Sequence, residues 1–465
     1  MRSGKVEPRS LTYVAQACGG ELLRGSETAT VTRVCTNSGQ AQPGDLFVAL
    51  AGERFDGHDY LVEAAQKGAV AVVGDREKLE GKNPGCAVIA VGNTRQALGA
   101  LAAGYRRDFD LPVIAVGGSN GKTTTKELFA AVLRPRFTVL WSEASFNNDI
   151  GVPLTLLSLD ATHQAAVVEV GTNHPGELAP LVRLIQPQFG LLTSIGREHL
   201  EFFGDLKSVA EEEGWLAELL PAEGRLLING DSPEIDGILR RTRARVIRVG
   251  LGPDNDWRAV DVNPDEFGVA FRLETTDASV NGDYRVNLLG RHQVVNAMLA
   301  AAAGKELGMK CEEIKTGLAE CRAAKMRMQL RTVNGVGVLD DAYNANTDSM
   351  LAALETLKDF PCSGRRVAVL GDMAELGAHS AQAHAEVGRR AAELKVDQLF
   401  TVGKMAGVMG AAARAAGLMR VIELGEVETV ANAVKHFVRT GDVVLVKASR
   451  ATRIERVSEV LCRPE

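Results

Sequence analysis

A glycine-rich stretch that ends in Lys and Thr, V-I-A-V-G-G-S-N-G-K-T-T-T at residues 113–125, carries the clearest chemistry in the sequence. Glycines let backbone amides close around phosphate oxygens, and the helix expected after them adds partial positive charge. Lys122 would reach the β- and γ-phosphates of a nucleotide, and the Thr123 hydroxyl would ligate Mg²⁺. The spacing departs from G-x-x-x-x-G-K-T at Val116, so we interpret the loop as a variant of that motif. The expected phosphate-binding residues are Gly117, Gly118, Ser119, Asn120, Gly121, Lys122, Thr123 and Thr124.

Polar stretches follow three further apolar strand patterns, at residues 142–157, 167–181 and 193–204. Because parallel strands end at the same edge of a sheet, we expect these stretches to meet beside the phosphate loop. Glu169 is a candidate metal carboxylate and His199 a candidate imidazole ligand. Alone, such residues are more often a hydrogen-bonded turn glutamate and a surface histidine. The nearby phosphate loop favours the metal-binding interpretation.

Length and composition bound the class of protein. A chain of 465 residues predicts two or three domains, and 45% hydrophobic with 24% charged residues is typical of a soluble globular protein. A net charge of −6 without a basic tract argues against nucleic-acid binding. Seven scattered cysteines without C-x-x-C argue against disulfides or zinc and favour a reducing compartment. Because no signal peptide or membrane-length apolar run is present, we expect a cytoplasmic protein without membrane insertion.

Alternating strand and helix patterns divide the chain into three α/β blocks. Residues 1–109 predict a small α/β domain. Residues 110–325 contain near-continuous apolar strands, which predict a doubly wound, mostly parallel sheet around the phosphate loop. A more polar insert at 246–290 is expected to be antiparallel. Residues 326–465 predict a second doubly wound, Rossmann-like sheet.

The order of these motifs resembles one known family. G-x-N-G-K-T-T-T, N-N-x-x-G-x-P, E-x-G-x-N-H-P-G-E, H-L-x-x-F-G, G-R-H-x-x-x-N and D-D-x-Y-N-A-N follow one another as in the Mur ligases of peptidoglycan synthesis. The resemblance covers essentially the whole chain. It implies an ATP- and Mg²⁺-dependent, ADP-forming peptide ligase with three domains. Residues 1–109 would bind a UDP-sugar, residues 110–325 ATP, and residues 326–465 the incoming amino compound.

The resemblance also implies roles for individual residues. Lys122, His199 and Arg327 would act in catalysis, with Asn296 near adenine and Asp341 at the ribose. Thr123, Glu169 and His199 would ligate metal. The remaining residues with expected substrate contacts are Ser38, Asn147, Asn148, Thr172, Asn173, His174, Tyr343, Asn344, Asn346, Lys447, Ser449 and Arg450.

The implied reaction phosphorylates a peptide carboxylate with ATP, after which an amine attacks the acyl phosphate. The D-D-x-Y-N-A-N form and G-D-M-A-E-L-G at residues 371–377 favour the member that adds D-Ala-D-Ala to UDP-MurNAc-tripeptide. The partners would therefore be small molecules, and we expect a monomer. The C-terminal domain would swing onto bound ATP about a hinge at residues 316–329.

Three alternatives remain at this point. The diaminopimelate- or lysine-adding relative is the nearest, although the D-N-P-R quartet of its diaminopimelate-type members is absent. Folylpolyglutamate synthase shares the phosphate loop but not the N-terminal segment. From a different class, a P-loop ATPase switch would hydrolyse ATP without any amino acid acceptor.

The chain also departs from the family pattern. Asn37 and Gly39 stand where an acid and an arginine are usual before P-G-D-L-F, and Ala448 replaces a glycine. We interpret His379 and His384 as structural rather than catalytic.

Three consecutive glutamates, Glu211 to Glu213, lie within a helix expected over residues 204–220. The simple interpretation is a solvated helix face. In the family, however, a lysine on this helix is carbamoylated and lies beside a second magnesium ion. Glu213 aligns with that lysine, so we hypothesise that its carboxylate supplies the metal-directed charge. Because this carboxylate would end about 3–4 Å short of the carbamate, it would act through water or a shifted helix. A solvated acidic run remains the alternative.

Overall fold

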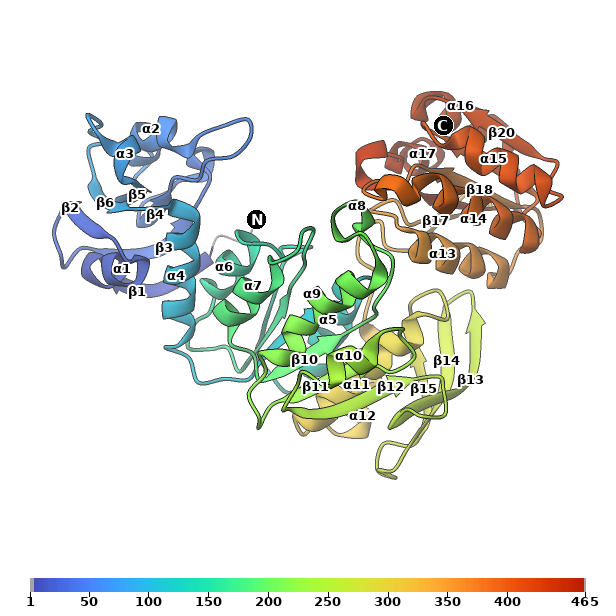
Figure 1. Cartoon of the computed structure of the whole chain (residues 1–465), viewed down its shortest axis with the longest axis horizontal. Helices are drawn as coiled ribbons and strands as arrows, with labels where there is room; N and C mark the ends of the chain where they lie inside the picture. The colour runs from blue at the N-terminus through green and yellow to red at the C-terminus, as the bar shows by residue number, and fades with distance from the viewer. Residues whose placement is uncertain (1–3, 464–465) are drawn as a thin grey trace.

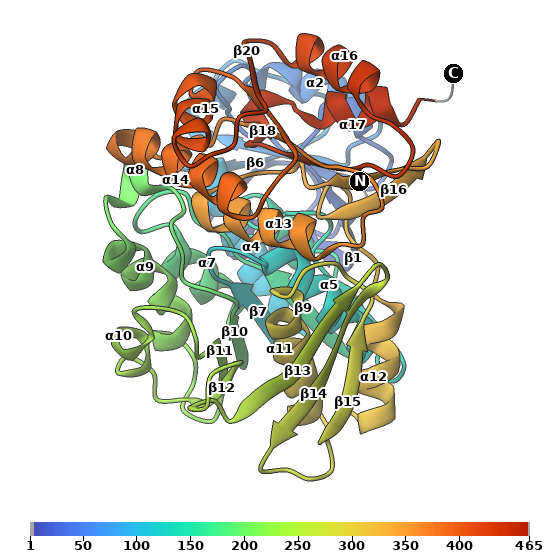
Figure 2. The same cartoon turned by 90° about the vertical axis from the view of Figure 1, so that its right-hand side faces the viewer.

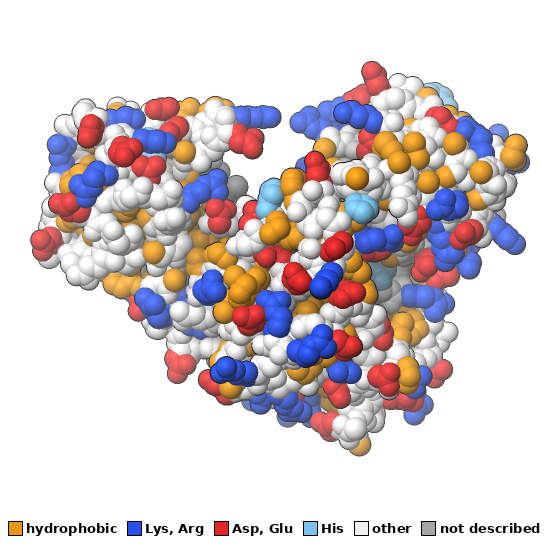
Figure 3. Space-filling view, viewed as in Figure 1, with side chains coloured by type: hydrophobic (Ala, Val, Ile, Leu, Met, Phe, Trp, Pro, Cys, Tyr) orange, Lys and Arg blue, Asp and Glu red, His pale blue; other side chains and the backbone are white. Residues whose placement is uncertain are grey.

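The computed structural model describes residues 4–463 and consists of three lobes. The N-terminal and C-terminal lobes stand on either side of the central one (Figure 1). The space-filling view shows a deep notch between the two outer lobes (Figure 3). Among the described residues, the strands form three separate sheets, one in each lobe. The expected α/β class with three domains is confirmed.

The N-terminal sheet has the strand order β1-β3-β4-β5-β6-β2, with parallel pairing from β3 to β6 and antiparallel edges. Long helix α4 links this lobe to the central one. The elements are β1 (Gly4–Ser10), α1 (Leu11–Cys18), β2 (Glu21–Arg24), β3 (Thr30–Cys35), η1 (Ser38–Gln40), β4 (Asp45–Val48), η2 (Gly57–Tyr60), α2 (Leu61–Gln66), β5 (Ala71–Asp75), α3 (Arg76–Leu79), β6 (Ala87–Val91) and α4 (Thr94–Arg106).

The central sheet has the order β15-β14-β13-β12-β11-β10-β7-β9-β8. Its middle strands are buried on both faces, as expected for a parallel sheet covered by helices. Its strands are β7 (Val113–Gly117), β8 (Val139–Trp141), β9 (Ala165–Glu169), β10 (Phe189–Leu192), β11 (Arg225–Asn229), β12 (Arg245–Gly250), β13 (Trp257–Asp265), β14 (Gly268–Thr275) and β15 (Gly282–Val286). Its helices are α5 (Lys122–Leu133), α6 (Gly151–Leu156), α7 (Leu178–Ile185), α8 (Leu200–Phe203), α9 (Leu206–Glu218), α10 (Ile235–Leu239), α11 (Gln293–Glu306) and α12 (Cys311–Glu320).

Strand β7 shows how the two faces of this sheet are filled. Val113 and Ala115 belong to the apolar cluster beneath α6, α7 and α9, whereas Ile114 and Val116 belong to the cluster beneath α5 and α11. This alternation follows from the two-residue repeat of a strand.

The expectation of an antiparallel insert at 246–290 is wrong at its start. Strand β12 pairs in parallel with β11, and β13 pairs in parallel with β12. Only β14 and β15 run antiparallel to their neighbours. The alternating pattern of polar and apolar residues here reflects strands with one exposed face, which does not determine strand direction.

The C-terminal sheet has the order β16-β17-β21-β18-β19-β20, parallel except for the edge strand β16. Figure 2 shows this lobe above the central one, with α13 facing it. The elements are β16 (Gln329–Val333), β17 (Val336–Asp340), α13 (Thr347–Asp359), β18 (Arg366–Gly371), η3 (Gly377–His379), α14 (Ser380–Glu393), β19 (Gln398–Val402), α15 (Ala406–Ala415), β20 (Val421–Leu424), α16 (Val427–Phe437), β21 (Val443–Lys447), η4 (Arg450–Thr452) and α17 (Glu455–Leu461).

Candidate functional site

The phosphate loop connects β7 to α5 at the carboxyl edge of the central sheet. β7 lies between β9 and β10, so the loop occupies the point where the order of the strands reverses, which is where α/β sheets bind ligands. Gly118 and Gly121 have φ of 109° and 87°. A Cβ on Gly118 would lie 2.5 Å from Thr193 Oγ1, and a Cβ on Gly121 would lie 2.6 Å from Asn296 Oδ1. Both conformation and space therefore require glycine at these two positions.

Lys122, the first residue of α5, turns its side chain back over the loop. Its Nζ donates to the carbonyl of Gly118 at 2.5 Å and lies 3.5 Å from Glu198 Oε2. Burial acts to lower the pKa of Lys122, but Glu198, then Glu213 and Glu169, more than offset it and raise the pKa. Lys122 is therefore a positive charge held among three acidic side chains, suited to receive phosphate oxygens.

Glu169 is the last residue of β9 and is 1% exposed. Its Oε1 accepts hydrogen bonds from Thr123 Oγ1 at 3.2 Å and Asn147 Nδ2 at 2.9 Å. Its Oε2 has no hydrogen-bond partner among the described residues and lies 3.8 Å from Lys126 Nζ. A carboxylate with a free oxygen beside a threonine hydroxyl is a donor set that suits Mg²⁺.

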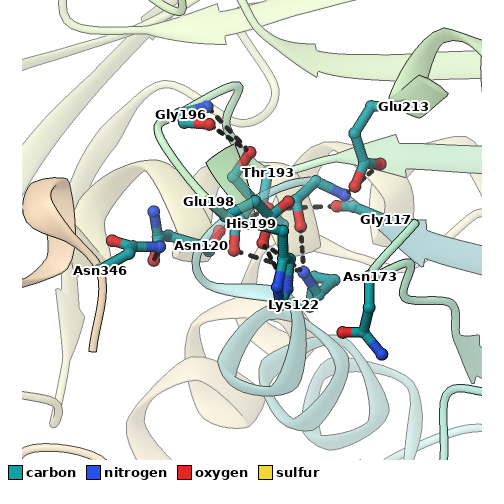
Figure 4. A network of polar contacts seen from close by, with 12 residues as sticks. Gly117, Asn120, Lys122, Asn173, Thr193, Gly196, Glu198, His199, Glu213 and Asn346 are labelled. Atoms are coloured by element: carbon teal, nitrogen blue, oxygen red, sulfur yellow. Dashed lines mark hydrogen bonds and ion pairs between the residues drawn. The ribbon is translucent and has the colours of Figure 1, made fainter. Parts of the chain in front are cut away.

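His199 lies next to Glu198 on the loop before α8 and has a left-handed backbone, with φ of 48°. Its Nδ1 is 2.5 Å from Glu375 Oε2 of the C-terminal domain, and its Nε2 is 3.9 Å from Glu198 Oε2. The hydrogen bond with His199 lowers the pKa of Glu375. Figure 4 shows His199, Glu198 and Lys122 grouped on one side of the phosphate loop.

The C-terminal domain contributes a second group of predicted residues. The Arg327 guanidinium lies 3.9 Å from the centroid of the Tyr343 ring. Asp341 follows β17 and accepts from Lys447 Nζ at 2.6 Å and from the Met328 amide at 2.9 Å. Asp341 follows β17 and Lys447 ends the neighbouring β21, and both line the same cavity as the phosphate loop, so the carboxyl edge of this second sheet faces the loop.

Direct contacts join the two domains around the loop. Asn346, the N-cap of α13, donates from Nδ2 to Asn120 Oδ1 at 2.9 Å. Arg197 binds Asp348 through its guanidinium and its amide, and reaches Glu386 at 2.8 Å. Hydrogen bonding first to Glu386 and then to Asp348 raises the pKa of Arg197.

A cavity of about 830 Å³ lies between the phosphate loop and the C-terminal domain. It is large enough for a nucleotide or a drug-sized molecule. The predicted residues that line it are Ser119, Asn120, Gly121, Lys122, Thr123, Thr124, Asn147, Asn148, Glu169, Thr172, Asn173, His199, Asn296, Arg327, Asp341, Tyr343, Asn344, Asn346 and Lys447.

Other predicted residues do not line this cavity. Gly117 and Gly118 belong to the loop but not to the cavity lining, and Glu213 lies behind them. His174 packs against Phe202 with ring centroids 4.2 Å apart, and Ser449 donates to the carbonyl of Asp372 at 2.8 Å. The predicted residues that do not line the cavity are Ser38, Gly117, Gly118, His174, Glu213, Ser449 and Arg450.

Ser38 lies in the N-terminal domain, where its hydroxyl donates to Glu63 Oε2 at 3.3 Å. The neighbouring departure from the family, Asn37, caps the same short helix by accepting from the Gly39 amide at 2.9 Å. The structure therefore does not bring Ser38 to the phosphate loop.

The three glutamates on α9 have different surroundings. Glu211 is exposed, but Glu212 accepts from the amides of Gly176 and Leu178 at 2.9 and 2.8 Å. Glu213 is 0% exposed, and its Oε2 accepts from the Gly118 amide at 2.7 Å. The solvated-face interpretation therefore holds for Glu211 alone.

The surroundings of the Glu213 side chain also differ from those that a metal ligand needs. Its Oε1 is buried without a hydrogen-bond partner among the described residues, and burial raises its pKa to about 8. Figure 4 shows it reaching the loop near Gly117, away from His199. Because a glutamate is shorter than the lysine it replaces, its carboxylate stops behind the loop rather than entering the cavity. The geometry does not support Glu213 as a direct metal ligand.

Several buried groups at the site were not singled out from the sequence. Glu198 is 5% exposed and lines the cavity. Lys126 is fully buried and donates to the carbonyls of Ser142 and Ala144 at 2.7 and 2.6 Å, which fixes the loop after β8. In the sequence, the only indication of a role for Glu198 is its position beside His199. The only indication for Lys126 is its position one helical turn after Lys122.

Across residues 4–463, no three His, Cys, Asp or Glu side chains gather into a ready metal cluster. Mg²⁺ commonly takes one or two protein carboxylates and completes its shell with water and substrate phosphates. The free oxygen of Glu169 beside Thr123 fits that mode of binding. No helix in the same range is long and apolar enough to cross a bilayer.

This fold and site define a three-domain nucleotide-binding α/β protein. Three family models match the chain in order: Mur ligase family, catalytic domain, at residues 30–106; Mur ligase middle domain at 116–304; and Mur ligase, glutamate ligase domain, at 326–450. The chain belongs to the Mur ligase family.

Individual relatives are similar over nearly their full length. UDP-N-acetylmuramoyl-tripeptide–D-alanyl-D-alanine ligases from Bacillus subtilis and Escherichia coli are 34% and 36% identical, covering 97% of this chain and 97% and 98% of theirs. A crystal structure of MurF from Acinetobacter baumannii has a TM-score of 0.90 at 30% identity, covering 98% of this chain and 99% of that one. MurF ligase from Thermotoga maritima in complex with ADP has a TM-score of 0.80 at 28% identity, covering 92% and 96%.

Proposed function

We propose that this chain is an ATP-dependent, ADP-forming ligase that joins D-alanyl-D-alanine to UDP-N-acetylmuramoyl-tripeptide in peptidoglycan precursor synthesis. The names of relatives at 34% and 36% identity over 97% of the chain support this substrate pair. The observation that carries the proposal is the cavity of about 830 Å³, which the phosphate loop and the C-terminal domain line together. A ligase needs such a shared space because ATP and two further substrates must meet there.

We assign one substrate to each domain. Residues 1–109 would bind the UDP-sugar through a surface that includes Ser38. Residues 110–325 would bind ATP at the loop, with Asn296 beside the base. Residues 326–465 would bind D-alanyl-D-alanine and bring Arg327 and Asp341 to the nucleotide. The notch between the outer lobes leaves room for a long UDP-peptide to span from one to the other (Figure 3).

The residues of the cavity suit acyl-phosphate chemistry. The peptide carboxylate attacks the γ-phosphorus of ATP, the bond to the β-phosphate oxygen breaks, and ADP leaves. The free amine of D-alanyl-D-alanine then attacks the acyl carbon, and phosphate leaves as the amide forms. Lys122 and Arg327 would neutralise charge on the transferred phosphoryl group, which is the main demand of such transfers. The amine loses a proton in the second step.

The side-chain oxygens of Thr123 and Glu169 suit a bound magnesium ion. Thr123 Oγ1 and the free Oε2 of Glu169 would hold the ion, and Asn147 keeps the Glu169 carboxylate in place through Oε1. When bound, Mg²⁺ would offset phosphate charge and orient the γ-phosphoryl group. Lys126 fixes the loop that carries Asn147 by holding its carbonyls.

Phosphate release tests the proposal. We expect the full chain with ATP and Mg²⁺ to release phosphate only when UDP-N-acetylmuramoyl-tripeptide and D-alanyl-D-alanine are both present, with mass spectrometry detecting the pentapeptide product. Lys122→Met should lower this rate by about 10³-fold or more because it removes the charge at the γ-phosphate. Lys305→Met, on the surface at the end of α11, is the matched control and should retain the rate.

The same assay separates the alternatives. A P-loop ATPase switch would release phosphate without an acceptor, and that outcome would overturn the proposal. The diaminopimelate- or lysine-adding relative would instead need UDP-N-acetylmuramoyl-dipeptide with one of those amino acids. Product formation from that pair, but not from tripeptide with D-alanyl-D-alanine, would move the chain to the other branch of the family.

A further inference from the structure

The stretch G-D-M-A-E-L-G at residues 371–377 leads into a turn to which the proposed reaction gives no role. Two side chains of the C-terminal domain anchor the start of this stretch. Asp372 accepts from two backbone amides of the loop after β19, at 2.8 and 2.9 Å. His384, which is 0% exposed, accepts through Nε2 from the Met373 amide at 2.9 Å. The turn that follows is therefore firmly attached to its own domain.

This turn contacts a segment of the central domain, residues 197–204, which contains α8 and lies beside the C-terminal lobe (Figure 1). The Glu201 amide donates to the carbonyl of Glu375 at 2.9 Å. His379 Nε2 donates to the carbonyl of Gly204, also at 2.9 Å. Because backbone groups take part in both hydrogen bonds, the turn and the segment lie in close contact across the domain boundary.

The side chain of Glu375 reaches a residue of this segment that is predicted to act in catalysis. Its Oε2 is 2.5 Å from His199 Nδ1, and both residues line the cavity together with Lys122. A carboxylate only accepts hydrogen bonds, so the proton of a neutral His199 ring lies on Nδ1. Nε2, which is 3.9 Å from Glu198 Oε2, then presents its lone pair, as the predicted metal role of His199 requires.

Both partners of this hydrogen bond have a left-handed backbone, with φ of 48° for His199 and 60° for Glu375. Such backbone costs about 1–3 kcal/mol for a residue other than glycine, and it is found mostly at functional sites. The two strained residues belong to different domains and meet at one hydrogen bond. The orientation of the His199 ring therefore depends on both domains.

We propose that Glu375 is a positioning residue of the ligase reaction, which fixes the His199 imidazole from the opposite domain. The site around Lys122 is then complete only when the C-terminal domain is closed. This inference deepens the proposed ligase function and rests on it. It also explains the stretch at residues 371–377, whose anchored start places Glu375 in the cavity wall. Because Glu375 acts through His199, its loss should lower kcat and leave the KM for ATP nearly unchanged.

Two substitutions separate this hydrogen bond from the rest of the side chain. Glu375→Ala removes the acceptor and should lower kcat at least about tenfold, with the KM for ATP within about twofold of wild type, because misplaced reacting groups are costly. Glu375→Gln keeps an oxygen that accepts from Nδ1 and should stay within about threefold of wild type. Glu393→Ala is the matched control, since Glu393 is an exposed glutamate of α14 in the same domain, and it should keep both constants.

The imidazole itself provides a measurement that does not depend on turnover. Long-range proton–nitrogen NMR spectra of the full chain, with isotope-labelled histidine, show which ring nitrogen carries the proton. They are recorded with saturating AMP-PNP and without divalent cations, and the His199 signals are those missing from His199→Gln. We expect the proton on Nδ1 in wild type and in Glu375→Gln, and a shift toward Nε2 in Glu375→Ala.

Four outcomes would overturn the proposal. The first is an unchanged kcat in Glu375→Ala, and the second is an equal loss of kcat in Glu375→Gln and Glu375→Ala. The third is a KM for ATP that rises in Glu375→Ala as much as kcat falls, which would assign Glu375 to nucleotide binding. The fourth is a His199 ring protonated on Nε2 in wild type. Failure of the ligase proposal is separate, because wild type would then form no pentapeptide while the imidazole spectra still report the contact.

Discussion

The central domain meets its two neighbours through junctions of opposite character. Toward the N-terminal domain, one apolar cluster runs without a break from the first sheet through Leu98 and Tyr105 of α4 to Leu181 of α7. Toward the C-terminal domain, Leu289 joins the apolar cluster of that domain, but the contacts around the cavity are polar, with Arg197 bound to Asp348 and Asn120 to Asn346.

This difference indicates which domain moves. Sliding an apolar junction exposes buried surface to water, whereas polar contacts exchange for water at small net cost. We infer that the N-terminal and central domains form one body and that the C-terminal domain opens and closes on it. The connection between α12 and β16 contains Met326 and Met328 with φ of 58° and 50°. Such backbone is uncommon for non-glycine residues, and this connection lies within residues 316–329, where the hinge stays a prediction.

The largest effect should come from breaking the apolar junction. Tyr105 is 1% exposed, and its hydroxyl accepts from the Glu7 amide and donates to the carbonyl of Leu159, both at 2.7 Å. Tyr105→Ala should lower the free energy of unfolding by about 3–5 kcal/mol, because it leaves a cavity in this core. Urea unfolding measures the loss.

Tyr105→Phe separates packing from hydrogen bonding at the same position. It keeps the ring and should cost only about 1–2 kcal/mol. AMP-PNP affinity of either folded variant should stay within about twofold of wild type, since the phosphate loop is not touched. A loss under about 1 kcal/mol in Tyr105→Ala would mean that this core does not hold the junction.

A second prediction concerns the interior of the fixed body, where Glu213 packs behind the phosphate loop. Its pKa is about 8 when folded and 4.5 for the ordinary group, so the folded chain holds one extra proton between these values. Stability should therefore fall as pH rises through this window, by about 2 kcal/mol between about pH 5.5 and 7.5.

Glu213→Gln has no such proton and should flatten the curve over that range. Unfolding free energies of both proteins at several pH values provide the measurement. Parallel curves for the two proteins would refute the raised pKa.

The parallel strands of the central and C-terminal domains could both be predicted from the sequence. They are mostly near-continuous apolar runs, so β7, β9, β10 and β11, and likewise β17, β18 and β21, could be located from the letters alone. Glu169 was found because a strand end determines where a side chain points. Strand direction in the insert could not be found, since an alternating pattern fits either direction.

The junction with the C-terminal domain depends on contacts between distant residues, which no local sequence pattern predicts. The pairing of His199 with Glu375 joins residues 176 positions apart, and no sequence pattern near either residue predicts the contact. Glu198 and Lys126 are charged, so the sequence predicts that they lie on the surface, because charged residues are seldom buried. Glu213 was located by a family alignment, and its carboxylate was expected to stop short, but the alignment could not show that it would accept from the Gly118 amide behind the loop.

A third prediction breaks the polar junction. Arg197→Ala removes the contacts to Asp348 and Glu386 and should lower kcat/KM for the ligase reaction by about tenfold, because fewer molecules would be closed. The matched control is Arg95→Ala at the other junction, where Arg95 pairs with Asp149 at 2.7 Å. That variant should stay within about twofold, since the apolar core holds that junction.

Steady-state rates at saturating ATP measure both variants. Unfolding free energy should change by less than about 1 kcal/mol in each, because exposed ion pairs add little stability. Equal losses of kcat/KM in the two variants would remove the distinction between the junctions.

The smallest effect should come from salt. The side chains of Arg197, Asp348 and Glu386 are 34%, 36% and 32% exposed, so dissolved ions reach the pairs and screen them. Raising NaCl from about 0.05 to 0.5 M should make closure of the C-terminal domain less favourable by under about 1 kcal/mol and leave the N-terminal junction unchanged.

Two fluorophore pairs, one across each junction, report the two distances in the same protein. Only the pair across the polar junction should lengthen, and the change should vanish in Arg197→Ala, which has no pair left to screen. A salt-dependent shift across the apolar junction would instead show that charge also helps to hold the N-terminal domain.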